Sequence, residues 1–111
     1  MDKKYMAIGT SMLVLKLLEE GEMYGYMIIR ELEERSESVF QLKEGTLYPV
    51  LHSLEQQGAV VSEEKTAQNG RVRRYYRLTP SGRGLLKEKE KEWADYQRAV
   101  NRVIGGVSFG L

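Results

Sequence analysis

The organisation of this chain follows from residues 44–58, which read EGTLYPVLHSLEQQG. The apolar residues of this stretch recur at intervals of three and four positions: Leu47, Val50, Leu51 and Leu54. That spacing predicts an amphipathic helix whose apolar face packs against a core. Thr46 is the expected N-cap, so that Pro49 falls in the first turn, where a backbone N–H would have no helical partner. Gly58 is the expected stop at the other end.

The face of this helix opposite the leucines is small, polar and nearly uncharged. A rotation of 100° per residue places Pro49, His52 and Gln56 at its centre, and Thr46, Tyr48 and Ser53 on its flanks. Charge stands only near the ends, at Lys43, Glu44 and Glu55. Such a face can enter the major groove of duplex DNA, and residues near the N-terminus of such a helix usually reach the base edges. The alternative is that TLYP forms only a cap and a turn.

The rest of the chain supplies the other elements of a DNA-binding fold. Helices are expected from Tyr5 to Glu20 and from Tyr24 to Ser36, strands from Val60 to Lys65 and from Val72 to Leu78, and a last helix from Pro80 to about Ile104. Asn69-Gly70 marks a turn between the strands, and Thr79 is the expected N-cap of the last helix. This order predicts a mainly α protein with a small β-hairpin. We expect a winged helix-turn-helix over residues 1–79, and a long C-terminal dimerisation helix with a short tail over residues 80–111.

Length and composition exclude several classes of protein. The chain has 111 residues, of which 41% are hydrophobic and 30% charged, as expected of one folded, helix-rich domain. It has no cysteine and a single histidine, and it has no glycine-rich phosphate loop. We therefore expect no metal, no cofactor and no enzymatic activity. The longest apolar run, Met12 to Leu15, is far shorter than the roughly 18 residues of a membrane span, so we expect a cytoplasmic protein without a membrane partner.

The expected hairpin concentrates positive charge, although the whole chain carries only +1. Residues 65–79 contain five basic residues and no acidic one: Lys65, Arg71, Arg73, Arg74 and Arg77. With Tyr76 and Leu78 on the buried face, Arg73, Tyr75 and Arg77 point the other way, and Arg71 and Arg74 lie nearer the tip or edge. Arginines on a protruding ribbon bind DNA phosphates, with a dependence on salt. The alternative is a solvated edge strand whose charges prevent aggregation.

The last helix carries a narrow apolar seam. Leu86, Trp93, Val100 and Val107 recur every seven residues, Tyr96 and Val103 fill the intermediate position, and Lys89 interrupts the first repeat. We expect this seam to pair with a second copy of the chain, together with part of the first helix, where Met6 lies. A sharper hypothesis is that Trp93 and Tyr96 line a cavity between protomers for an aromatic or hydrophobic effector. The alternative is that Trp93 is interface core.

Taken together, GTLYPVLHSLEQQG, RRYYRLTPSGRGLL and MYGYMII resemble the landmarks of the PadR-like winged-helix transcriptional regulators, over about residues 5–104. The resemblance implies a homodimeric repressor of a palindromic operator in double-stranded DNA, with the third helix in the major groove and the wing beside it. The implied DNA-facing residues are Lys43, Thr46, Tyr48, His52 and Ser53 around the third helix, and Arg71, Arg73 and Arg74 on the wing. Lys3 and Lys4 are a weaker suggestion, since a solubilising N-terminus accounts for them equally well.

The resemblance also bears on the effector and on the competing functions. Longer relatives carry a multi-helix C-terminal domain, so this chain is similar to the short subgroup, and the ligands of longer members do not transfer. Some short members look as if they sense aromatic drugs through a tryptophan on this helix. The competing function is a winged-helix protein-interaction module without specific DNA binding. Metal-sensing and multiple-antibiotic-resistance regulators fit less well, because clustered ligands are absent and a single helix ends the chain.

Overall fold

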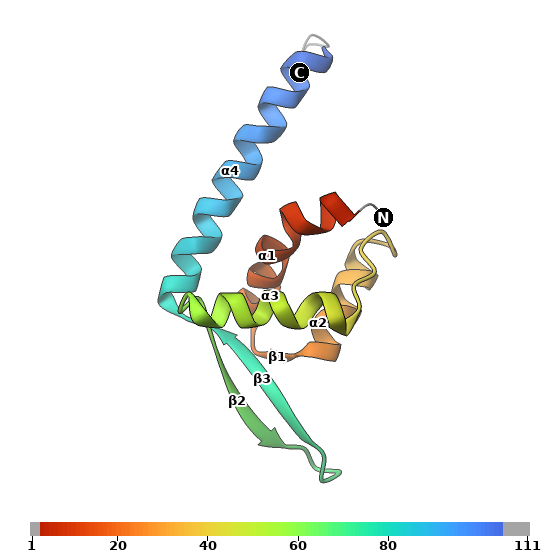
Figure 1. The fold of residues 1–111 in the computed structure, drawn as a ribbon, viewed down its shortest axis with the longest axis vertical. Helices are drawn as coiled ribbons and strands as arrows, with labels where there is room; N and C mark the ends of the chain where they lie inside the picture. Colours follow the sequence, from red (N-terminus) through yellow and green to blue (C-terminus); the bar gives the residue numbers. More distant parts are fainter. Residues whose placement is uncertain (1–2, 106–111) are drawn as a thin grey trace.

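The computed structural model describes residues 3–105, with side chains from Gly9 onward, and these residues form four helices and a three-stranded sheet (Figure 1). The elements in chain order are α1 (Lys3–Glu20), β1 (Met23–Tyr24), α2 (Gly25–Arg35), α3 (Glu44–Gln56), β2 (Val60–Thr66), β3 (Val72–Leu78) and α4 (Pro80–Ile104). The first three helices form the body of the molecule. The hairpin of β2 and β3 extends from the body at one end of the long axis, and α4 extends at the other. The predicted mainly helical winged fold is confirmed, and the bounds of α1, α2 and α4 lie within two residues of those expected.

The core lies where the three short helices meet the base of the sheet. Leu15 of α1 and Ile28 of α2 are fully buried, and Val60 and Tyr76 cover them from the sheet. From α3 the core receives Leu47, Leu51 and Leu54, with Val50 partly buried beside them. The predicted apolar face of α3 is thus confirmed. Burial of each leucine contributes about 1.5–3 kcal/mol, so α3 is held mainly by packing and its outer face is free to vary.

The start of α3 differs from the prediction. Lys43, not Thr46, is the N-cap, and its carbonyl accepts hydrogen bonds from the N–H groups of Thr46 and Leu47, each at 3.0 Å. Pro49 consequently lies inside the helix rather than in its first turn. Its missing N–H leaves the Gly45 carbonyl without its helical partner, which is tolerated because Gly45 is exposed to water. Helix formation extends one turn earlier because Glu44 in the first turn complements the helix dipole.

The end of α3 follows the prediction. Gly58 has φ of 77°, and the N–H of the next residue, Ala59, bonds to the Leu54 carbonyl at 2.9 Å. The Gly58 N–H bonds to the Glu55 carbonyl at 3.0 Å. These two bonds make the Schellman arrangement in which a left-handed glycine ends a helix. They turn the chain directly into β2.

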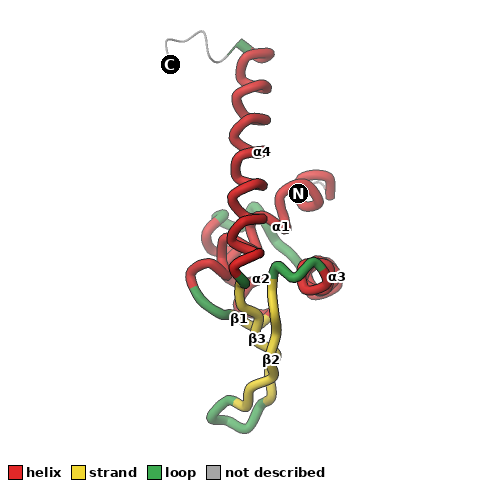
Figure 2. The backbone as a smooth tube through the Cα atoms, turned by 90° about the vertical axis from the view of Figure 1, so that its left-hand side faces the viewer, coloured by secondary structure: helices red, strands yellow, loops and turns green. Residues whose placement is uncertain are grey.

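The sheet has a strand that the sequence analysis missed. Its order is β1-β3-β2, all antiparallel, and β1 pairs Met23 with Tyr76 and Tyr24 with Tyr75 (Figure 2). Two residues between helices are too few to show the alternation of apolar and polar residues that marks a strand. Strand β1 therefore forms because of its pairing with β3 rather than through local propensity. The hairpin itself pairs in register from Val60 with Leu78 to Thr66 with Val72. At its tip the Arg71 N–H donates to the Asn69 side-chain oxygen at 3.0 Å.

Thr79 joins the wing to α4. As predicted, it is the N-cap: its hydroxyl oxygen accepts from the Gly82 N–H at 2.9 Å, and Pro80 follows it in the first turn. The same hydroxyl lies 2.6 Å from the Gly58 carbonyl oxygen, to which it donates. Gly82 packs so closely on the Ala59 carbonyl that a Cβ there would lie 2.0 Å from its oxygen. These contacts fix the direction in which α4 leaves the sheet.

The distal part of α4 has no covering within the described chain. Leu86 is buried in the core, whereas Trp93 is 41% exposed and Val103 is 86% exposed. Figure 1 shows the helix running free of the body beyond its first turns. An ion pair between Lys16 and Glu90, with N and O 3.6 Å apart, links α4 to α1. No described helix is long and apolar enough to cross a membrane.

Candidate nucleic-acid interface

The outer face of α3 is open to solvent. Every residue predicted there is exposed: Lys43, Thr46, Tyr48, His52 and Ser53. Ser53 accepts a hydrogen bond from the Gln57 side chain at 3.1 Å, while the imidazole of His52 has no hydrogen-bond partner among the described residues. The face therefore offers small polar groups and one free imidazole. This is the surface chemistry that contacts with base edges require.

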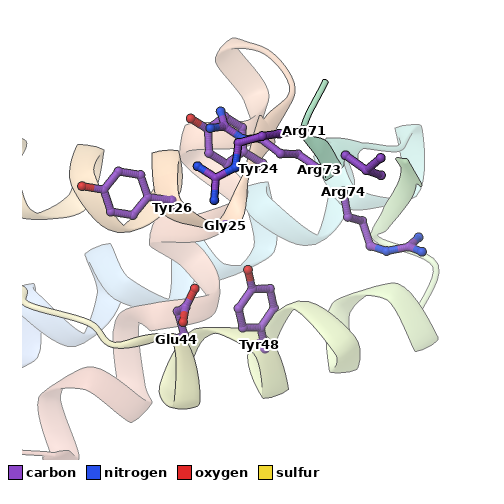
Figure 3. Close-up of a pocket in the computed structure, with 9 residues that line it drawn as sticks. Tyr24, Gly25, Tyr26, Glu44, Tyr48, Arg71, Arg73 and Arg74 are labelled. Atoms are coloured by element: carbon purple, nitrogen blue, oxygen red, sulfur yellow. The ribbon is translucent and has the colours of Figure 1, made fainter. Parts of the chain in front are cut away.

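Tyr48 occupies a distinct place on α3. Its ring leans toward the start of α2, and a Cβ on Gly25 would come within 2.5 Å of its hydroxyl oxygen. Figure 3 shows the ring rising from α3 toward Gly25 and the arginines of the wing. The contact exists only because residue 25 has no side chain. Tyr48 thus lies on the flank of α3 nearest the wing rather than at the centre of the outer face.

The wing arginines differ in their partners. Among the described residues, no carboxylate lies within ion-pair distance of Arg71, Arg73 or Arg77. Arg74, in contrast, donates to Glu64 of the neighbouring strand at 3.2 Å and to the hydroxyl of Ser62 at 3.0 Å. The sequence reasoning counted acidic residues only after position 65 and so missed this pairing across the hairpin. The free positive charge of the wing is therefore smaller than predicted.

Arg74 also links the wing to α3. The Ser62 hydroxyl that accepts from Arg74 donates in turn to the Glu55 carboxylate, 2.7 Å away. These exposed polar contacts contribute little stability, since surface pairs are typically worth under about 1 kcal/mol. Their geometric effect is to hold the C-terminal end of α3 against β2.

Aromatic rings support the wing on its other face. The Arg73 guanidinium lies over the Tyr24 ring, 4.2 Å from its centroid, and Tyr24 meets Tyr75 edge to face at 5.4 Å. Lys65 lies 5.5 Å from the Tyr75 centroid and donates to Glu22 at 2.5 Å. The hydrogen bond from Glu22 raises the pKa of Lys65 above its ordinary value. Stacking orients the Arg73 guanidinium and leaves its N–H edges available to an anion.

A cavity of about 500 Å³ opens between the start of α2, the start of α3 and strand β3 (Figure 3). Its lining residues are Tyr24, Gly25, Tyr26, Glu44, Tyr48, Arg71, Val72, Arg73 and Arg74. Four of the predicted DNA-facing residues thus share one concave site, namely Tyr48, Arg71, Arg73 and Arg74. The sequence reasoning missed Tyr24, Gly25 and Tyr26 as site residues. The available signal was the MYGYMII stretch, which was used only as a family landmark.

A second cavity, of about 250 Å³, lies beside α4. It is lined by Met12 of α1 and by Lys89, Glu92, Trp93 and Tyr96 of α4. The Trp93 and Tyr96 rings are stacked, with centroids 6.0 Å apart and planes 26° apart. Of the other predicted seam residues, Leu86 belongs to the core, and Val100 and Val103 continue along α4. Val107 and the side chain of Met6 lie outside the described part of the structure.

Comparison with known proteins identifies the family of this chain. Residues 14–88 match the model of the transcriptional regulator PadR-like family. The chain belongs to the PadR-like family. It is 37% identical over 95 residues to Transcriptional regulator Rv3488 of Mycobacterium tuberculosis, which covers 86% of this chain and 82% of that protein.

Two solved structures show the shared PadR-like architecture. A transcriptional regulator from Clostridium thermocellum has a TM-score of 0.83 at 30% identity, covering 89% of this chain and 96% of its own. A PadR family transcriptional regulator from Eggerthella lenta has a TM-score of 0.77 at 32% identity, covering 86% and 81%. Members of the PadR-like family are DNA-binding transcriptional regulators rather than enzymes. The family resemblance and the winged-helix fold expected from the sequence are confirmed.

Proposed function

We propose that this PadR-like protein is a homodimeric repressor that binds a palindromic operator and is released from it by a small aromatic effector. The observation that carries the proposal is the pairing of two exposed surfaces. The uncharged outer face of α3 stands beside a wing on which Arg71 and Arg73 have no carboxylate partner among the described residues. The former surface suits base readout and the latter suits phosphate binding. Residues 1–79 would be the DNA-binding unit, and residues 80–111 the dimerisation helix and tail.

The DNA-facing residues of the proposal are those on which sequence and geometry agree. On and before α3 they are Lys43, Thr46, Tyr48, His52 and Ser53, and on the wing Arg71, Arg73 and Arg74. Arg74 has the weakest claim, because its guanidinium already bonds to Glu64 and Ser62. Arg73 has the strongest claim on the wing, since the Tyr24 ring orients it and no acidic residue neutralises it.

The uncovered face of α4 supports the dimer. Trp93, Tyr96, Val103 and Ile104 are exposed on one projecting helix. A single helix that exposes so much apolar surface to water is unfavourable, and pairing with the same helix of a second chain removes that surface from water. The dimer also suits the operator, since a two-fold protein matches two half-sites about one helical turn apart.

The cavity at Trp93 supports the effector. At about 250 Å³ it is smaller than a typical ligand site, so one protomer supplies only part of a pocket. A second chain docked along α4 would close its open side. Stacked indole and phenol rings bind flat aromatic molecules, and the lining carries one positive side chain, Lys89, and one negative side chain, Glu92.

Fluorescence anisotropy over a salt series tests DNA binding. The duplex upstream of the protein's own gene is compared with a scrambled duplex, for the wild type and for the double variant Arg73→Ala with Arg74→Ala. The wild type should prefer the upstream duplex, and its affinity should fall steeply with salt. The double variant should bind all duplexes more weakly and with a flatter slope, by about 1 in log–log units for each lost phosphate contact.

The matched control is Arg83→Ala, an exposed arginine on α4 that lines neither cavity. It removes one positive charge, against two in the double variant, and should leave the slope unchanged. Unchanged binding by the wing double variant would refute the assignment of the wing. Equal, weak, salt-independent binding of both duplexes by the wild type would instead favour a protein-interaction module.

A further inference from the structure

His52 combines three properties that no other described side chain on the outer face of α3 shares. It is exposed, it has no partner among the described residues, and its side chain is of the type that gains a charge near neutral pH. We propose that His52 makes operator binding depend on pH, because its protonated ring donates to a guanine in the major groove. The inference rests on the proposed DNA binding and deepens it, since the proposed function assigns no titrating group and no base to α3.

The composition of the chain makes His52 the one side chain suited to such a dependence. The sequence has a single histidine and no cysteine, and histidine is the ordinary side chain that changes charge between about pH 5 and pH 8. The pKa shifts that the structure causes in carboxyl and tyrosine groups point away from this range. The hydrogen bond from Arg35 lowers the pKa of Glu20, and burial raises the pKa of Tyr76. The N-terminal amine titrates in the same range but lies outside the described residues, so the experiment must separate it from His52.

No carboxylate of the described chain competes with DNA for the imidazole. The elements packed most closely against α3 are α1, α2 and β2. Their described charged side chains are Lys16, Glu19, Glu20, Arg30, Glu31, Glu33, Glu34, Arg35, Glu63, Glu64 and Lys65. None of these carboxylates, and neither Glu44 nor Glu55 of α3 itself, lies within ion-pair distance of His52. Glu55 is turned toward β2, where it accepts from the Ser62 hydroxyl at 2.7 Å.

His52 stands at the centre of the face that is proposed to read bases. With the leucines of α3 buried, the residues at the centre of the opposite face are Pro49, His52 and Gln56, and all three are exposed. Pro49 and Gln56 cannot ionise. Protonation of His52 therefore gives the middle of this face its one positive charge, which the negative potential of DNA attracts.

The hydrogen-bonding pattern of the two ring forms selects the base. A protonated imidazole has two N–H donors and no acceptor, whereas the neutral ring has one of each. Guanine presents two acceptors in the major groove, N7 and O6, and each other base presents at most one. A hydrogen bond from a charged donor is also roughly twice as strong as a neutral one. Protonation should thus raise the affinity for the operator and sharpen the preference for guanine at one position of each half-site.

The direction of the pH dependence follows from linkage. Because the protonated form binds DNA more tightly, the complex takes up protons, and the affinity for the operator rises as the pH falls. The gain should be absent above about pH 8 and complete near about pH 5, the range over which an imidazole changes charge. One charge-assisted hydrogen bond corresponds to about tenfold in affinity for each half-site.

Anisotropy titrations at constant ionic strength, between about pH 8 and pH 5.5, test the inference on the full chain and its operator duplex. The first variant is His52→Gln, which keeps a hydrogen-bonding side chain that does not titrate. The matched control combines His52→Gln with Asn101→His, which moves the histidine to an exposed site on distal α4. The wild type should bind about tenfold more tightly per half-site at the lower pH, and neither variant should show this change. Replacing one guanine at a time by 7-deazaguanine, which lacks the N7 acceptor, should remove the dependence at one position per half-site.

Each other outcome identifies what is wrong. A wild type that binds its operator specifically, but equally at both pH values, would overturn the inference and leave the proposed function standing. A pH dependence that persists in His52→Gln would belong to the N-terminal amine, and one that Asn101→His restores would belong to net charge; either result refutes the role of His52. Loss of the dependence in His52→Gln without any effect of 7-deazaguanine would refute the assignment to guanine. If no duplex is preferred at any pH, the proposed function itself fails.

Discussion

The substitution Gly82→Ala should strongly destabilise the protein, although alanine normally stabilises a helix. Gly82 lies in the first turn of α4, and a Cβ there would lie 2.0 Å from the Ala59 carbonyl oxygen and 2.7 Å from the Leu78 Cδ1 atom. A methyl group cannot occupy that space while the carbonyl remains in place. Either α4 tilts away from the sheet, or the turn between α3 and β2 moves.

The size of the effect follows from the contacts that this movement breaks. Overpacking of this kind costs about 1–3 kcal/mol. The Ala59 carbonyl accepts from the Thr79 N–H at 3.0 Å, and Thr79 in turn accepts from the Gly82 N–H at 2.9 Å. Loss of these two bonds adds about 1 kcal/mol each. The higher helix propensity of alanine offsets about 1 kcal/mol of this loss. The free energy of unfolding should therefore fall by about 2–4 kcal/mol.

Gly84→Ala is the matched control. Gly84 is exposed two residues further along the same helix, and apart from its chain neighbours and the adjacent helix backbone no atom lies within 4 Å of a Cβ built on it. It should gain stability by up to about 1 kcal/mol. Both variants are measured by urea denaturation at one fixed protein concentration, because association contributes to the apparent stability of a dimer. If Gly82→Ala matches or exceeds the wild type, the close contact that orients α4 is refuted.

The remaining predictions concern the cap, the α2–α3 contact and the seam. Thr79→Val keeps the shape but removes the cap oxygen, and should lower the free energy of unfolding in urea by about 1–2 kcal/mol; no change would contradict the capping role. Gly25→Ala should displace the Tyr48 ring and weaken operator binding several-fold in anisotropy, with unchanged binding counting against this contact. Trp93→Ala should raise the dimer dissociation constant about tenfold or more in sedimentation velocity and abolish any response to aromatic ligands; retention of both would remove Trp93 from the proposal.

The parts of the fold that follow from local pattern were predictable. The three- and four-residue spacing of Leu47, Leu51 and Leu54 gave the buried face of α3, and Thr79-Pro80 gave the start of α4. Gly58 likewise marked a helix end with a left-handed residue. In each case the sequence signal and the structural cause act within about one turn of the chain. No tertiary contact was needed to identify them.

The parts that depend on distant partners were not predictable. Strand β1 has two residues and exists because β3 offers a free edge. Arg74 was taken as a free charge because Glu64 precedes the turn, and only the register of the hairpin brings the two side chains together. The contact between Tyr48 and Gly25 joins two residues that are 23 positions apart in the sequence and lie on different helices. Composition and periodicity carry no information about such pairs.

The order of the strands also bears on how the outer face of α3 and the wing can move relative to each other. Strand β1 lies between α1 and α2 in the chain and pairs with the central strand β3. The base of the wing is therefore hydrogen-bonded to the helical body. The same strand pairing and the Arg74–Ser62–Glu55 hydrogen bonds join the wing to α3, so we expect the two to move together. An effector bound near Trp93 would therefore change the conformation of the DNA-binding unit of one chain very little. In the proposed dimer, an effector would instead act by changing the distance and angle between the two DNA-binding units, and so their fit to two half-sites.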